Sequence, residues 1–194
     1  MTRAVLAVLP LLLAAGASAH AAHVVGSVTI AGSPARETVV YLESGRGTPP
    51  TPPPHAVMDQ KNLSFVPAVL PVVRGTVIEF TNSDDVQHNV FTASSGAQKF
   101  DLGTYNRGDS RTVTLSEAGE LVILCNIHME MEARILVLDE ATFTMTRPDG
   151  SFELPSVPAG SYRLRLWRKR WLGHTETVTV PEKDDVRLDV RAVE

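Results

Sequence analysis

A lone cysteine at the end of an apolar run is the feature that most restricts what this chain can become. Cys125 follows the apolar residues 121–124, and His128 and Met131 come shortly after it. The run predicts a buried strand, and residues 132–139 predict the strand that returns. The ligand-type side chains therefore lie on a short loop held at both ends by strands, which fixes their geometry better than a free loop would.

These three side chains offer a thiolate, an imidazole and a thioether. One thiolate with two imidazoles and a weak axial thioether is the donor set of copper electron-transfer centres. The second imidazole has to come from elsewhere, and His88, within residues 80–91, is the best candidate. Cys125 is the only cysteine, so it is a buried inert thiol, an intermolecular link or a metal thiolate. Its neighbours favour the metal thiolate.

The motif Cys-x2-His-x2-Met, with a His-Asn pair far upstream, resembles the cupredoxins, and most of all amicyanin and plastocyanin-like proteins. The resemblance covers about residues 57–139. It implies an all-β fold, a Greek-key β-sandwich that holds one type 1 copper ion. The ligands that it implies are His88, Cys125, His128 and Met131.

The resemblance also assigns supporting roles around the loop. Asn82 and Asn89 are expected to brace the ligands through hydrogen bonds. The axial position stays open between Met131, which is ranked first on its spacing, and the alternatives Met129 and Glu130.

The implied activity is single-electron transfer between redox partners. The ligand set is closed by protein groups and leaves no open position for a substrate, which favours a carrier over an enzyme. Electrons would leave through His128 within an apolar patch that includes Ile127 and Met129, toward a redox protein such as a c-type cytochrome or a dehydrogenase. The alternatives are a copper storage or delivery protein, and a non-catalytic β-sandwich binding module.

The N-terminus predicts secretion. Residues 1–21 have a positive start at Arg3, an apolar middle and small-residue cleavage sites, which is typical of a signal peptide. The apolar run is too short to span a bilayer comfortably, so no membrane span is expected. A periplasmic or extracellular address follows. His20 and His23 would lie near the new N-terminus, most simply in a solvated tail.

The flanks of the ligand-bearing segment predict a second unit. Residues 24–46 and 140–194 show alternating strands with Asp-Gly and Ala-Gly turns, and together they resemble a carboxypeptidase-regulatory-like, transthyretin-like β-sandwich module. A proline-rich linker is expected at 47–55. The copper domain, 56–139, would then be inserted into this smaller β-sandwich or be followed by it.

The charge pattern indicates less about function than the ligand motif does. The net charge of −4 gives no reason to expect a nucleic-acid surface. Residues 167–171, Trp-Arg-Lys-Arg-Trp, are the most basic spot of the chain. This segment is either a strand whose rings pack inward while its cations face water, or a docking site for a partner.

Overall fold

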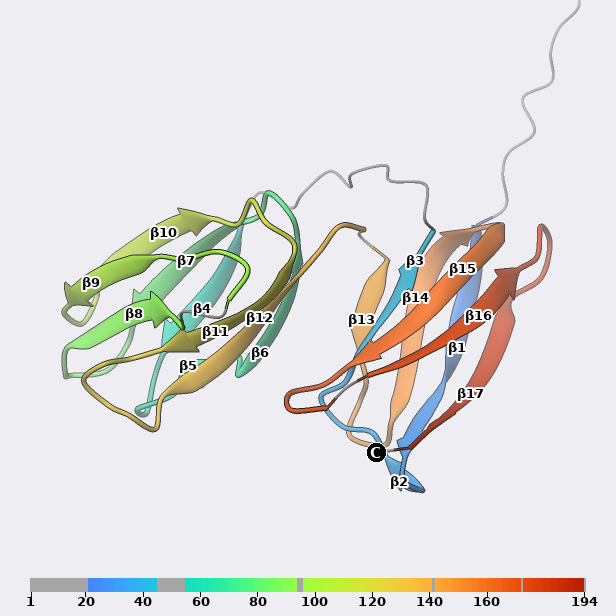
Figure 1. Ribbon diagram of the computed structural model, residues 1–194, viewed down its shortest axis with the longest axis horizontal. Coiled ribbons are helices and arrows are strands. Elements are labelled where there is room, and N and C mark those ends of the chain that lie inside the picture. Colours follow the sequence, from blue (N-terminus) through green and yellow to red (C-terminus); the bar gives the residue numbers. More distant parts are fainter. Residues whose placement is uncertain (1–20, 45–54, 94–95, 141, 172, 194) are drawn as a thin grey trace, which may run out of the picture.

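The computed structural model describes residues 21–44, 55–93, 96–140, 142–171 and 173–193, and within these ranges every regular element is a β-strand. The expected all-β fold is confirmed. The strands form two units that lie side by side (Figure 1). The predicted linker falls almost wholly outside the described residues, as do residues 1–20 of the predicted signal peptide.

Unit 1 contains the strands between the predicted linker and residue 139. Its strands are β4 (Ala56–Gln60), β5 (Phe65–Val66), β6 (Val69–Val73), β7 (Val77–Asn82), β8 (His88–Thr92), β9 (Asp101–Tyr105), β10 (Ser110–Thr114), β11 (Gly119–Leu124) and β12 (Glu132–Leu138). One sheet has the order β10-β7-β4-β5 and the other β6-β12-β11-β8-β9. Apolar side chains from both sheets form one buried core, which includes Phe80, Ile123 and Ile135.

Unit 2 is made from both ends of the described chain. Its strands are β1 (Ala21–Ile30), β2 (Ser33–Pro34), β3 (Val39–Glu43), β13 (Phe143–Met145), β14 (Ser151–Pro158), β15 (Gly160–Trp167), β16 (His174–Val180) and β17 (Val186–Ala192). One sheet has the order β14-β1-β17, with β2 on β1, and the other β13-β3-β15-β16. The core between them includes Val28, Leu42, Phe152 and Leu164.

The chain leaves and re-enters unit 2 at one place. β3 and β13 pair antiparallel, with Tyr41 opposite Phe143, and the N–H of Leu42 donates to the carbonyl of Thr142. The end of β3 therefore lies beside the start of β13, although all of unit 1 comes between them in sequence. Adjacent ends of this kind are what make the insertion of a domain physically easy.

The Asp-Gly turn predicted in unit 2 is present, but it does not form a hairpin. Residues 149 and 150 connect β13 to β14, which belong to different sheets. Gly150 has φ of 81°, and a Cβ there would lie 2.5 Å from the carbonyl oxygen of Val28. The glycine is required because the chain turns tightly against β1 as it changes sheet.

The strand that returns from the ligand loop is buried on both faces. After its first residue, every residue of β12 is buried, whereas β11 before it alternates. One face of β12 packs in the core of unit 1. Leu136 and Leu138 on the other face form an apolar cluster with Val69 of β6 and Val39 of β3, so that unit 2 covers this strand.

Candidate metal centre

The ligand loop, residues 125–131, joins β11 to β12. β11 pairs antiparallel with β8, with Leu124 opposite Phe91. Because the strands run in opposite directions, the chain that continues after Leu124 runs back along β8 toward its first residue. His88 is the first residue of β8, so the pairing places it beside the loop that follows β11.

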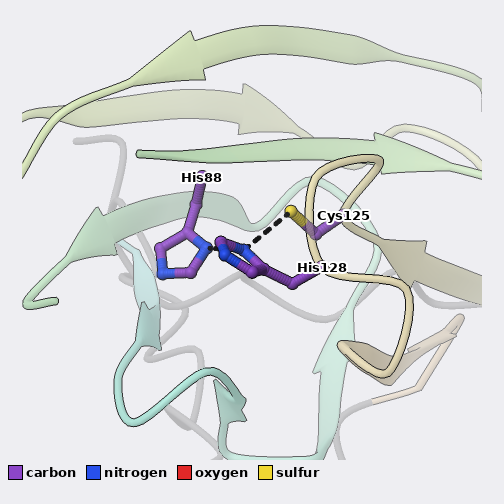
Figure 2. Close-up of side chains that lie close together, drawn as sticks. All are labelled: His88, Cys125 and His128. Atoms are coloured by element: carbon purple, nitrogen blue, oxygen red, sulfur yellow. Dashed lines mark hydrogen bonds between the residues drawn. The ribbon is translucent and has the colours of Figure 1, made fainter. Parts of the chain in front are cut away.

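Three of the four predicted ligands meet there. The Nδ1 atoms of His88 and His128 are 3.1 Å apart, and the Sγ of Cys125 is 4.0 Å from Nδ1 of His128. One potential ligand atom from each residue lies within 4.8 Å of the others. Figure 2 shows both rings and the thiol directed toward a common point.

The donor set and its spacing fit a copper ion. Two nitrogen ligands that are each about 2.0 Å from one metal ion lie about 3 Å apart, which is close to the spacing of the two Nδ1 atoms here. One thiolate and two imidazoles are the trigonal set of copper electron-transfer sites. His88 is fully buried and Cys125 is 4% exposed, so these two side chains are screened from bulk water, whereas His128 is half-buried.

Asp84 fixes the orientation of the first imidazole. Its Oδ2 lies 3.0 Å from Nε2 of His88 and accepts a hydrogen bond from the backbone N–H of Leu63, and its Oδ1 accepts one from the backbone N–H of Asn62. Burial on its own would raise the pKa of the Asp84 carboxyl, but these hydrogen bonds, led by the one from Leu63, hold that pKa below its ordinary value. An ionised carboxylate on Nε2 keeps the proton there and leaves the lone pair on Nδ1 for a metal.

Asn89 supports the cysteine. Its backbone N–H lies 3.5 Å from the Cys125 sulfur, its Oδ1 accepts from the N–H of Asn126, and its Nδ2 donates to Asp101. A backbone donor at a thiolate stabilises the negative charge on the sulfur.

Asn82 supports the turn that precedes His88. Its amide donates to the carbonyls of Val86 and Tyr105, and its Oδ1 accepts from the N–H of Asp84. The bracing expected of this residue is therefore directed at the turn that precedes His88, not at the loop that carries Cys125.

The three axial candidates differ in burial. Met131 is 1% exposed and belongs to the same core cluster as Cys125. Met129 is 91% exposed, and Glu130 is also exposed. The N–H of Met131 donates to the carbonyl of His128, which closes the loop into a tight turn. Of the three side chains, Met131 is the one on the buried side of the loop.

The proposed exit side of the loop is apolar and accessible. Ile127 is 45% exposed and Met129 is 91% exposed, on either side of the half-buried His128. Val86, in the turn that leads to His88, is 45% exposed.

The other described histidines lie away from this cluster. His55 pairs with Glu79, His23 with Glu153, and His174 with Glu176. His20 lies outside the described residues.

Asp84 was not among the residues expected at the site, although its spacing of four residues from His88 was a usable signal. The basic segment at 167–171 was singled out from the sequence, but its partner was not. Trp167 packs against the apolar cluster between the units, and Lys169 pairs with Glu132, beside the ligand loop. Its charge pattern alone could not identify that internal partner.

Comparison with known proteins supports the assignment of unit 1. Residues 54–138 match the family model of copper binding proteins of the plastocyanin/azurin family. The recognition of a cupredoxin in this part of the chain is confirmed. Residues 139–188 match the model of polysaccharide lyase family 4, domain II. This description differs from the carboxypeptidase-regulatory-like resemblance expected for the segment. No curated protein matches the chain significantly.

Several solved structures are similar to part of the chain. A copper-containing nitrite reductase from Thermus scotoductus SA-01 is 27% identical over 46% of this chain, with a TM-score of 0.43; the match spans 23% of the reductase. An oxidised amicyanin mutant is 20% identical over 44% of this chain and 83% of its own, with a TM-score of 0.42. A purple cupredoxin from Nitrosopumilus maritimus is 22% identical over 43% of this chain and 99% of its own, with a TM-score of 0.40.

Among the described residues, no helix is long and apolar enough to cross a membrane.

Proposed function

We propose that this protein is a secreted type 1 copper protein that carries single electrons between redox partners. The observation that carries the proposal is the convergence of His88 Nδ1, His128 Nδ1 and Cys125 Sγ within 4.8 Å of one another. Bound copper would supply a one-electron couple at this point. The match of residues 54–138 to the plastocyanin/azurin family supports copper as the ion.

Other residues of the chain position the proposed ligands His88 and Cys125 in the metal-free protein. His88 is fixed by Asp84, and Cys125 lies against the backbone N–H of Asn89. Groups that are already in place need to move little when charge changes at the site, which favours rapid electron transfer. Met131, buried beside Cys125, is the proposed axial ligand.

The same residues restrict access. Protein side chains fill the proposed coordination positions, and catalytic metals usually keep one position open. We therefore propose a carrier and not an enzyme. Electrons would leave through the ring of His128, between Ile127 and Met129. A redox protein such as a c-type cytochrome or a dehydrogenase would dock there over a small area.

The proposed organisation places this site in an inserted domain, 56–139, within a β-sandwich formed by 24–46 and 140–194. The pairing of β3 with β13 supports that division. A signal peptide at 1–21 would direct the protein to the periplasm or the outside of the cell. This segment has small-residue cleavage sites after Ala19 and after Ala21, and cleavage at the first would leave all of β1, which begins at Ala21, in the mature chain.

One spectrum of the purified protein with Cu(II) tests the proposal. An intense visible thiolate-to-copper band is expected in the wild type, and none in Cys125→Ser. A weak band with rapid loss of metal to a chelator would instead indicate storage or delivery. Absence of copper binding would reject the proposal and leave a β-sandwich binding module.

A further inference from the structure

The turn between β15 and β16 brings unit 2 to the ligand loop of unit 1. In Figure 1 this turn points from unit 2 toward unit 1. Lys169, within it, places its Nζ 2.8 Å from Oε1 of Glu132. Glu132 is the first residue of β12 and directly follows Met131. A side chain of one unit thus contacts the side chain of the residue that follows a proposed ligand in the other.

Glu132 is also held from within unit 1. The same Oε1 lies 2.8 Å from NH2 of Arg134, and Nε of Arg134 lies 2.8 Å from Glu120. The four charges form a continuous chain, Lys169–Glu132–Arg134–Glu120, and Arg134 is only 9% exposed. An isolated surface ion pair contributes little, but a network with a nearly buried arginine holds its members in one geometry.

Apolar packing keeps Lys169 in reach of this network. Trp167, two residues earlier, packs against the cluster of Val39, Val69, Leu136 and Leu138 that joins the two units. The ring therefore lies at the base of the turn, in the apolar cluster to which both units contribute. Burial of an aromatic ring contributes far more to stability than an exposed ion pair does. The indole of Trp167 therefore holds the turn in place, and Lys169 makes its contact with Glu132.

The ligand loop needs an external support of this kind. The five residues between Cys125 and Met131 include no proline, so the chain itself does not restrict their φ angles. On the Met131 side, the hydrogen bond from its N–H to His128 closes the turn, and β12 begins at the next residue. Because Met131 and Glu132 are joined by one peptide bond, a contact that restrains Glu132 also restricts the backbone of Met131.

We propose that Lys169 of unit 2 is a positioning residue for the ligand loop, acting through Glu132 on Met131. Its effect on the copper site rests on the function proposed above, whereas its ordering of the loop in the metal-free protein does not. The weak axial thioether is a ligand through which the properties of such a copper site are tuned. Unit 2 would then adjust the centre without contributing a ligand.

The test uses full-length protein and four substitutions. Lys169→Met removes the ammonium and keeps the aliphatic stem, and Lys169→Arg is the conservative rescue. Lys183→Met is the matched control, because it removes the same charge from an exposed position in the β16–β17 connection of unit 2. Glu132→Gln, alone and combined with Lys169→Met, shows whether the lysine acts through the glutamate. The measurements are amide hydrogen exchange at Met131 in metal-free protein, and the rate of copper loss to a chelator in loaded protein.

Lys169→Met is expected to speed exchange at Met131 and to speed copper loss roughly tenfold, the lower end of the cost of removing an outer support of a metal ligand. Lys169→Arg and Lys183→Met should resemble the wild type in both rates. In the Glu132→Gln background, Lys169→Met should cause no further change in amide exchange or in copper loss. Unchanged exchange, or an equal effect in both backgrounds, would overturn the inference. Failure of the wild type to show a thiolate band would instead reject the copper function, and the exchange measurement would still decide the role of Lys169.

Discussion

The Nδ1 atoms of His88 and His128 lie 3.1 Å apart, although the residues are 40 positions apart in the chain. Two ring nitrogens this close cannot both carry a proton without strong repulsion, so at least one presents a lone pair. Asp84 on Nε2 of His88 directs that lone pair into the space shared with Cys125. This relationship is what turns a local Cys-His-Met motif into a site with two imidazoles.

Removal of either imidazole should therefore abolish the site. His128→Ala is expected to eliminate the visible thiolate band and to weaken copper binding by more than the roughly 10–100-fold that loss of an outer support costs. Titration with Cu(II), followed by absorption, measures both effects. His55→Ala is the control, because its ring pairs with Glu79 outside the cluster. A variant at 128 that keeps the band would remove this residue from the site.

The two methionines of the loop should behave differently. Met131→Leu conserves volume in the core and should cost less than about 1.5 kcal/mol of unfolding free energy, so the protein stays folded. Loss of the Met131 thioether should shift the reduction potential and the electron paramagnetic resonance spectrum of the copper site. Met129→Leu, at a 91% exposed position, should leave both unchanged. The reverse result would make Met129 the axial ligand.

The exposed apolar side chains beside His128 should control electron exchange but not the copper spectrum. Met129→Glu introduces a charge into the proposed docking patch, and desolvating that charge opposes association. The second-order rate of reduction by a c-type cytochrome should fall, with the visible spectrum retained. Val193→Glu, at an 81% exposed position in unit 2, is the control. Equal rates for both variants would place the exit elsewhere.

Asn89 should be needed to hold the cysteine end of the loop. Asn89→Ala removes the acceptor for the N–H of Asn126 and the donor to Asp101 at a site that is 2% exposed. The loss of buried partners should cost about 1–3 kcal/mol of stability. Chemical denaturation measures this cost, and faster copper loss should accompany it. Asn106→Ala, at an exposed position, should change neither quantity.

The proposed domain division can be tested with a fragment. Residues 56–140 contain every strand of unit 1 and its core. The fragment is expected to fold and to give the thiolate band. It should also self-associate, because Leu136 and Leu138 lose their cover from unit 2. Size-exclusion chromatography and absorption read out these results, and a fragment that does not fold or bind copper would argue against an independent domain.

Much of the fold could be predicted locally. The apolar run before Cys125 lies in β11, and the return strand expected at residues 132–139 is β12. The two glycine turns of unit 2 also join strands, although each joins strands of different sheets. Local periodicity does not identify β6, because Pro71 interrupts its pattern; the structure puts this strand at a sheet edge, where proline is tolerated. β9, another edge strand, contains Gly103, which interrupts its pattern in the same way.

The all-β class and the local ligand motif could be inferred from the residue pattern, because strand periodicity and the spacing of Cys125, His128 and Met131 are properties of neighbouring residues. Which faces and which distant residues meet at the site depends on how the strands pair and pack. The pairing of β8 with β11 brings His88 to the thiol, and the docking of unit 2 brings Lys169 to Glu132. Such contacts depend on strand register and on packing between sheets, and the pattern of one short segment does not encode either of them.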